Sequence, residues 1–310
     1  MSAFKSGDFI HPLDKIARQQ LEGIPLLQPA VRQYLKVMGE KQWRAMLLAN
    51  AIRLGPRQVP EVYRYLPPIC EKFGIDEPEL FIMRGDSNAF TVGHTKTVIV
   101  LYDQLLEDLN DDEIKAVIAH ECGHIVCEHI LYRQMTHALI GTTNALSMFT
   151  GPVGGLAKVA SAPLQMAIMT WYRKSELSAD RAAAVYLASP DPLQRALFHM
   201  TGVPKWFTGT VSYPDFVAQT QEFDMLAEQG KWGAILTRRI DNASTHPNPA
   251  IRFRELTSWA ETREYHALLE VSGKDSAAGR AKCSNCGHNM EAGWSFCQRC
   301  GSASDSPGNL

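Results

Sequence analysis

The stretch AHECGH, residues 119–124, constrains the chain more than any other feature, because it sets two histidines four residues apart. The surrounding run LNDDEIKAVIAHECGHIVCEHI predicts one α-helix over about residues 111–130. Asn110 and Glu113 have the spacing of a capping box, and acidic residues in the first turn suit the helix dipole. Apolar residues recur at helical spacing behind them.

On this helix His120 and His124 share one face. Each residue turns an α-helix by about 100°, so the two rings stand one turn apart and can reach one zinc ion. Glu121 flanks that face rather than joining it. The pattern H-E-x-x-H is typical of two zinc ligands with a glutamate as general base.

The other metal-capable side chains of this helix are predicted to take no part. Cys122 points to the opposite wall, as a small buried residue. Cys127 lies about 10.5 Å along the axis from His120, too far to share a metal with both histidines. His129 is predicted to face the back of the helix.

A catalytic zinc needs a third protein ligand and one open position. The segment QMAIMTWYRKSELSADRAAAVYLAS predicts a second helix, on which Glu176 and Asp180 share a face. Glu176 is the candidate ligand, and Asp180 would accept the free ring N–H of a ligand histidine. The alternative is a solvated acidic pair bonded to Lys174 and Arg181.

Several separate motifs follow one another in a familiar order. They are SNAF (87–90), Asp112-Glu113 leading into AVIAHECGHI, SELSADRAA, and STHP (244–247) with Arg252. Over about residues 60–265 the chain resembles the HtpX-like and CAAX-prenyl-protease-type zinc endopeptidases of peptidase family M48. The resemblance implies that Glu176 is the third ligand. It also implies that His246 lies at the active site, where a donor opposite the metal is needed, although a lone histidine is more often structural.

A small sheet is predicted just before the zinc helix, from strand-like runs at Leu80–Met83 and Thr97–Leu101 with turns between them. In the resembling enzymes an edge strand near the site binds extended substrate. Asn88 and Ala89 are the candidates for that strand. The alternative for Asn88 is a turn residue that caps its own backbone.

The C-terminal run CSNCGHNMEAGWSFCQRCG carries two C-x-x-C pairs with ten residues between them. Its thiols are Cys283, Cys286, Cys297 and Cys300. Four thiolates at this spacing predict a zinc ribbon with a second, structural zinc. Two disulfides are the alternative, which a chain without a signal-peptide core does not favour.

The predicted fold is therefore α+β: a mostly helical zincin-type metallopeptidase domain with a small sheet, plus a zinc ribbon. The expected parts are an N-terminal helical region packed on the peptidase (1–75), the peptidase domain (76–265), a linker (266–282), the ribbon (283–301) and a disordered tail (302–310). Residues 1–75 are expected to be mostly helical, because LQPAVRQYLKVMGEKQWRAMLLANAIRL carries apolar residues at helical spacing. PEVYRYLPPICEKFGI is predicted to be another helix, interrupted at Pro67-Pro68.

Location and membrane contact are less constrained. Residues 134–157 contain no Asp, Glu, Lys or Arg, yet many are small or polar, which favours a loop or broken helix over the site. Because no signal-peptide core is present, a cytoplasmic location is expected, with peripheral membrane contact left open.

The expected function is a zinc endopeptidase that hydrolyses polypeptides with a zinc-bound water and Glu121 as general base, in protein quality control. The alternative is an adaptor that recruits a protein partner through the ribbon and carries a latent or inactive peptidase fold. A net charge of −2 argues against nucleic-acid binding by the whole chain. From Lys274 onward only one net positive charge remains, a poor phosphate footprint.

Overall fold

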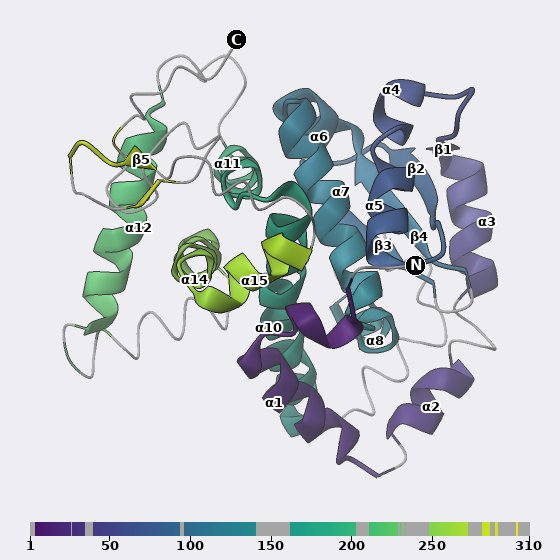
Figure 1. The fold of residues 1–310 in the computed structure, drawn as a ribbon. Helices are drawn as coiled ribbons and strands as arrows, with labels where there is room; N and C mark the ends of the chain where they lie inside the picture. The colour runs from purple at the N-terminus through teal and green to yellow at the C-terminus, as the bar shows by residue number, and fades with distance from the viewer. Residues whose placement is uncertain are drawn as a thin grey trace. The chain divides into compact units, whose positions relative to one another are not determined.

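The computed structural model of the chain describes residues 4–25, 27–34, 40–93, 96–140, 162–202, 211–228, 230, 233, 248–271, 281–285, 289–290 and 302. The chain divides into two compact units, Met1–Leu106 with Glu121–Ala179, and Glu107–His120 with Asp180–Leu310. Helices α7 (Asp111–Val126) and α10 (Ala162–Leu187) each run through this division without interruption (Figure 1).

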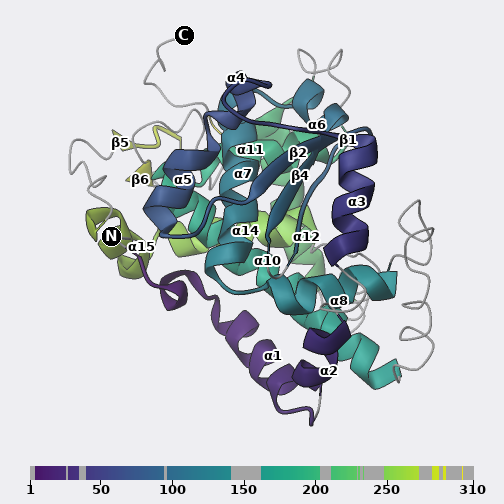
Figure 2. The same ribbon diagram turned by 90° about the vertical axis from the view of Figure 1, so that its right-hand side faces the viewer.

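The first unit contains a four-stranded mixed sheet in the order β1-β2-β4-β3. The strands are β1 (Ala51–Arg53), β2 (Glu79–Met83), β3 (Ala89–Val92) and β4 (Val98–Tyr102). β2 runs parallel to β4, whereas β1 and β3 are antiparallel to their neighbours. β3 thus forms one edge of the sheet. Figure 2 shows α3 (Glu40–Asn50) beside β1 and β2, and its Leu47 packs into the core with Phe81 and Val100.

Helices make up most of the rest of this unit. They are the 3₁₀ turn η1 (Ser6–Phe9), α1 (Pro12–Glu22), α2 (Leu27–Tyr34), α4 (Pro60–Tyr63), α5 (Leu66–Phe73), α6 (Asp103–Asp108) and α8 (Ile130–Ile140). The prediction of a mostly helical chain with a small sheet before the zinc helix is confirmed.

Two local predictions in the N-terminal region need correction. Residues Ala51–Arg53 form β1 rather than helix, since Ala51 pairs with Met83 in the sheet. A strand of three residues leaves too short a pattern to be separated from the helical spacing before it. The helix break lies before Pro67-Pro68, not at them: α5 begins at Leu66, and both prolines lie in its first turn, which suits proline.

The start of α7 is as predicted, but its end is not. Asn110 Oδ1 accepts hydrogen bonds from the backbone N–H groups of Asp112 and Glu113, and Asn110 N–H donates to Glu113 Oε2 at 3.1 Å, so the capping box is confirmed. The predicted single helix to residue 130 is wrong: α7 ends at Val126 and α8 begins at Ile130.

A left-handed turn separates these two helices. Glu128 has a φ of 60°, and the His129 N–H donates back to the carbonyl of His124 at 2.9 Å. This closing bond resembles the way many helices satisfy their last carbonyls. Its consequence is that His129 lies on a reversed segment, and its ring direction no longer follows the rotation of α7.

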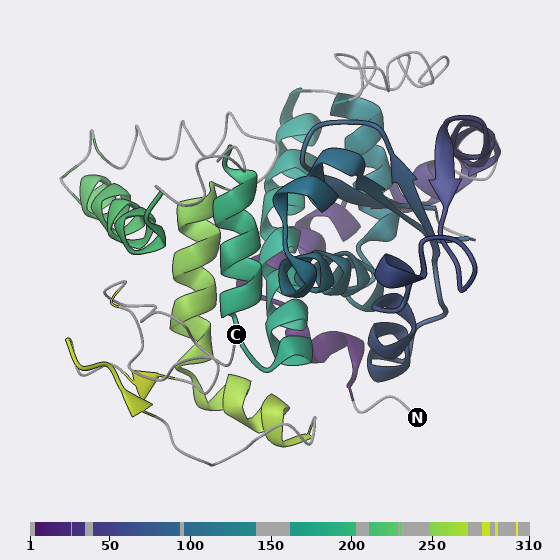
Figure 3. The ribbon, with the colours of Figure 1, turned by 90° about the horizontal axis from the view of Figure 1, so that it is seen from above.

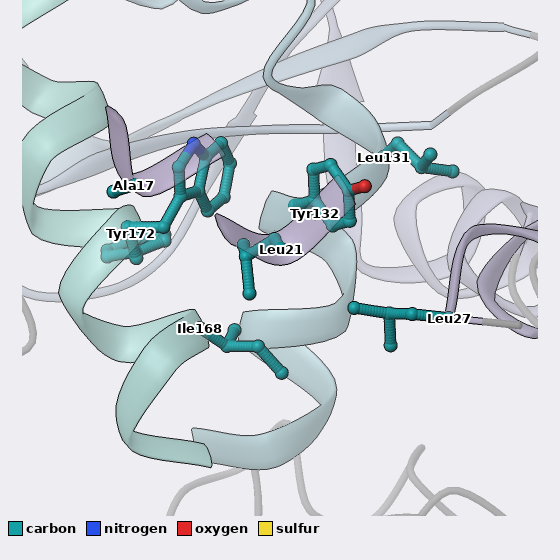
Figure 4. Close-up of a cluster of buried hydrophobic side chains, with 8 residues drawn as sticks. Ala17, Leu21, Leu27, Leu131, Tyr132, Ile168 and Tyr172 are labelled. Atoms are coloured by element: carbon teal, nitrogen blue, oxygen red, sulfur yellow. The ribbon is translucent and has the colours of Figure 1, made fainter. Parts of the chain in front are cut away.

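A buried apolar cluster docks the N-terminal helices on α8 and α10 (Figure 4). Its members are Ala17, Leu21, Leu27, Leu131, Tyr132, Ile168, Trp171 and Tyr172. Leu21 and Trp171 are both 0% exposed, so α1 is an integral part of this core. The aromatic rings of Tyr132 and Trp171 pack edge to face, with centroids 5.4 Å apart.

The second unit contains α11 (Asp191–Met200), α12 (Tyr213–Glu228), α14 (Pro249–Ala260), α15 (Arg263–Val271) and the short hairpin β5 (Ala281–Lys282) with β6 (Asn289–Met290). In Figure 3, α11 and α14 lie side by side, and Gln194 of α11 donates to Phe253 O and Thr257 Oγ1 of α14. Among the described residues, no helix has both the length and the apolarity needed to span a bilayer. Of the predicted loop or broken helix at residues 134–157, the described part, residues 134–140, belongs to helix α8, and the rest lies outside the described residues.

Candidate metal centre

The predicted ligand residues come together. His120, His124 and Glu176 each offer one ligand atom, and these atoms all lie within 4.8 Å of one another. His124 Nε2 is 3.3 Å from Glu176 Oε1. The three side chains are buried, with exposed fractions of 5%, 0% and 1% in that order. Two imidazoles and one carboxylate are a donor set that suits a catalytic zinc.

His120 is oriented by a buried ion pair. Its Nδ1 lies 2.9 Å from Asp180 Oδ1, and Arg252 donates to both oxygens of that carboxylate, at 2.5 and 2.9 Å. Burial alone would raise the pKa of Asp180, but Arg252 and His120 outweigh it, so the pKa of this carboxyl lies below its usual value. An ionised Asp180 accepts the Nδ1 proton of His120, which leaves Nε2 with a lone pair for a metal.

Glu176 has a partner that the sequence did not suggest. Arg133 of α8 donates to Glu176 Oε1 at 2.5 Å, and its guanidinium stacks on the Tyr172 ring at 4.6 Å. Burial would lower the pKa of Arg133, but Tyr172 and Glu176 raise it above its usual range, so Arg133 keeps its charge. A single arginine in an apolar segment carries no motif that would have identified it.

The alternative of a solvated acidic pair on α10 is excluded by burial. Glu176 and Asp180 are each 1% exposed. Arg181, the suggested surface partner, lies instead near Glu264 at 4.0 Å and over the Trp259 ring at 4.7 Å.

Glu121 is held by the sheet. Thr91 of β3 donates its hydroxyl hydrogen to Glu121 Oε2 at 2.5 Å, and both side chains are buried. Sequence reasoning missed Thr91. The signal available was its position two residues beyond Ala89 in the predicted edge strand, because alternate residues of a strand point to the same side.

The prediction that His129 faces the back of the helix is wrong. Its Nδ1 lies 2.9 Å from Nδ1 of His124, and both rings are fully buried. The left-handed turn at Glu128 brings the ring round, because His129 no longer continues the α7 helix. Its other ring nitrogen, Nε2, is 2.9 Å from Asp14 Oδ2.

Asn88 and Ala89 stand at the beginning of the edge strand. Ala89 is the first residue of β3, and Asn88 precedes it. Asn88 Oδ1 accepts from the Ala89 N–H at 2.8 Å, so this side chain caps the local backbone, as the alternative interpretation had it. A substrate-binding role for these two residues stays a prediction.

Several predicted site residues lie outside the described residues: His246, Cys286, Cys297 and Cys300. Cys283 is described and is buried directly after β5. The hairpin of β5 and β6 agrees with a ribbon, but the structural zinc site stays a prediction.

Comparison with known proteins decides the family. The model of peptidase family M48 matches residues 56–260, about two thirds of the chain. The chain belongs to peptidase family M48. It is therefore a metallopeptidase, a hydrolase, and the M48 family supports polypeptide substrates and zinc. The adaptor alternative is not favoured.

Relatives of this M48 peptidase include named proteases. It is 28% identical over 272 residues to the "Plastoglobule-localized metallopeptidase 48, chloroplastic" of Arabidopsis thaliana, covering 87% of this chain and 77% of that protein. It is 26% identical over 240 residues to the "Protease HtpX homolog" of Ralstonia pickettii, covering 70% and 80%. The solved structure of S. mikatae Ste24p aligns with 19% identity and a TM-score of 0.40, over 79% of this chain and 57% of Ste24p.

Proposed function

We propose that this M48 peptidase is a zinc-dependent endopeptidase with His120, His124 and Glu176 as the zinc ligands. The observation that carries the proposal is the convergence of these three buried donors beside Glu121. His120 Nδ1 has Asp180 as its acceptor and His124 Nδ1 has His129 beside it, so Nε2 of each histidine would be the atom that binds zinc.

When bound, zinc supplies an acidified water and polarises the peptide carbonyl. Glu121 is the general base that accepts the proton of the attacking water and passes it to the leaving amine. Thr91 orients the carboxylate by binding Oε2, which leaves Oε1 of Glu121 to handle the proton. His246, which belongs to the STHP motif, is the proposed hydrogen-bond donor to the reacting peptide carbonyl.

We propose that the substrate binds as an extended chain along β3. β3 is an edge strand, and it carries Thr91, the residue that contacts Glu121. Main-chain pairing at a sheet edge accepts many sequences, which suits a quality-control enzyme acting on unfolded polypeptides. All four residues of β3 are buried and α8 packs against this strand, so substrate entry includes an opening step.

The remaining predictions join this proposal. A second, structural zinc would drive the folding of the C-terminal ribbon. The folded ribbon could then recruit a protein partner. Peripheral membrane contact agrees with a relative that is named as plastoglobule-localized, whereas the cytoplasmic location stays a prediction. The proposed peptidase activity depends on the buried cluster of His120, His124 and Glu176.

The proposed function is tested by cleavage of a denatured protein mixture with mapping of the new termini. Cleavage at internal bonds is expected, stopped by a zinc chelator and restored by added zinc. Magnesium in place of zinc serves as the control and should not restore cleavage. Persistent cleavage in excess chelator, after metal analysis shows no zinc, would contradict the proposal.

Thr91→Val is expected to lower kcat by about 10- to 100-fold, because a hydrogen bond to a charged group contributes about 1.5–3 kcal/mol. Zinc content should not change, since Thr91 contacts the base and no ligand. Steady-state kinetics and metal analysis are the measurements. Thr97→Val, a half-buried threonine just before β4, is the matched control. Equal kcat values for the two variants would remove Thr91 from the mechanism.

A further inference from the structure

The two ring nitrogens of His124 have different surroundings. Nε2 is 3.3 Å from Glu176 Oε1, on the side of the ligand cluster. Nδ1 is 2.9 Å from His129 Nδ1, and the more distant Arg133 Nη1 lies 3.5 Å from it. A neutral imidazole that binds a metal through Nε2 must carry its proton on Nδ1. His124 therefore donates, and His129 Nδ1 must be the acceptor.

The same requirement fixes which ring nitrogen of His129 carries the proton. If Nδ1 of His129 accepts, its proton is on Nε2, which lies 2.9 Å from Asp14 Oδ2. The hydroxyl of Ser178 donates to the same oxygen at 2.5 Å, and the His11 N–H donates to Ser178 Oγ at 2.9 Å. Two separate hydrogen-bond paths thus converge on the carboxylate of Asp14.

Asp14 suits the role of final acceptor. It is 1% exposed and lies on α1, 115 residues before His129 in the chain. Burial alone would raise its pKa, but His129, Ser178 and Arg18 outweigh it, and the pKa of Asp14 lies below its usual value.

We propose that Asp14 is a positioning residue for the metal centre: through His129 it fixes the proton and the ring orientation of His124. The proposal rests on the proposed zinc site. Outer partners of metal-bound histidines commonly contribute about 10- to 100-fold to metal affinity. Asp14 lies outside residues 56–260, the part of the chain that matches the M48 family model.

The packing of α1 explains how a distant carboxylate reaches this place. Ala17 and Leu21 hold α1 in the apolar cluster with α8 and α10 (Figure 4). On the next face Arg18 donates to the carbonyl of Cys127 and to Glu128, at 3.2 and 3.1 Å. α1 therefore also holds the left-handed turn that brings His129 round to His124.

The test measures the zinc affinity of the full chain by competition with chelators of graded strength. Asp14→Ala is expected to weaken one zinc site by about 10- to 100-fold. Asp14→Asn keeps an acceptor oxygen without the charge, so it should fall between Asp14→Ala and the wild type. Glu22→Ala removes the other acidic residue of α1, which pairs with Arg18, and should leave the affinity unchanged.

The same titration in a Glu176→Ala background separates this proposal from the proposed function. Glu176→Ala is expected to remove the affected site, after which Asp14→Ala should change nothing further. If Glu176→Ala removes a zinc but Asp14→Ala binds like the wild type, the role of Asp14 is overturned and the zinc site stands. If Glu176→Ala leaves zinc binding intact, the proposed zinc site itself fails.

A second readout does not depend on any variant folding well. Long-range ¹H–¹⁵N spectra of the zinc-loaded wild type should show His129 protonated on Nε2 and bare on Nδ1, and His124 protonated on Nδ1. A proton on Nδ1 of His129 overturns the proposal. A purely structural Asp14 would lower the melting temperature of Asp14→Ala while both affinity and tautomers stay as in the wild type, and that result overturns it too.

Discussion

Glu121→Gln is expected to lower peptide cleavage by at least about 100-fold, the lower end of what a positioned general base contributes. Glutamine has nearly the same shape as glutamate but cannot accept the proton of the attacking water. The side chain is 3% exposed and bonded to Thr91, so the substitution should fit without repacking. Cleavage of an unfolded polypeptide and zinc content are measured together.

Zinc content is the decisive companion measurement for this variant. Because Glu121 is the base and not a ligand in the proposal, Glu121→Gln should bind as much zinc as the wild type. Glu107→Gln, an exposed glutamate on α6, is the matched control and should cleave normally. Normal turnover by Glu121→Gln would remove Glu121 from the mechanism.

Glu176→Ala is expected to abolish both cleavage and one of two bound zinc ions. The wild type should bind two zincs, one at the His-His-Glu cluster and one at the proposed ribbon. Loss of the carboxylate leaves two imidazoles, too few protein ligands for a catalytic zinc. Metal analysis after gel filtration should show a fall from two ions to one.

Folding must be separated from metal loss in this variant. Removing Glu176 leaves Arg133 as a buried charge without its ion-pair partner, a change that costs about 3–5 kcal/mol in proteins. Glu176→Gln keeps a hydrogen-bond acceptor for Arg133 and is the second variant, with the same expected zinc loss. Circular dichroism checks the fold. A well-folded Glu176→Gln that retains both zincs would contradict the assignment.

Predictions that rest on a single local segment agree best with the structure. The Asn110–Glu113 capping box, the helix that carries Glu176 and Asp180, and the strands β2 and β4 all follow from short-range patterns. The failures also have a local cause. β1 is short, and the end of α7 depends on one residue, Glu128, in a left-handed conformation.

The partners of the site residues were harder to foresee. No sequence motif identifies Thr91, Arg133 or Asp14. They contact their partners across 30, 43 and 115 residues of sequence. Such contacts depend on how whole helices and strands pack, and a spacing pattern within one element carries no information about that packing.

The sequence by itself determined which metal-binding and basic side chains share one helix face: helix geometry alone puts His120 and His124 together with Glu121 beside them. Only the tertiary structure decided which side chains complete and orient that chemistry. It brought Glu176 to the histidines, turned His129 back toward His124, and set Asp14 of α1 behind it. The reason is physical: rotation about one helix axis is a local property, whereas burying these polar groups together requires the apolar packing of segments far apart in the chain.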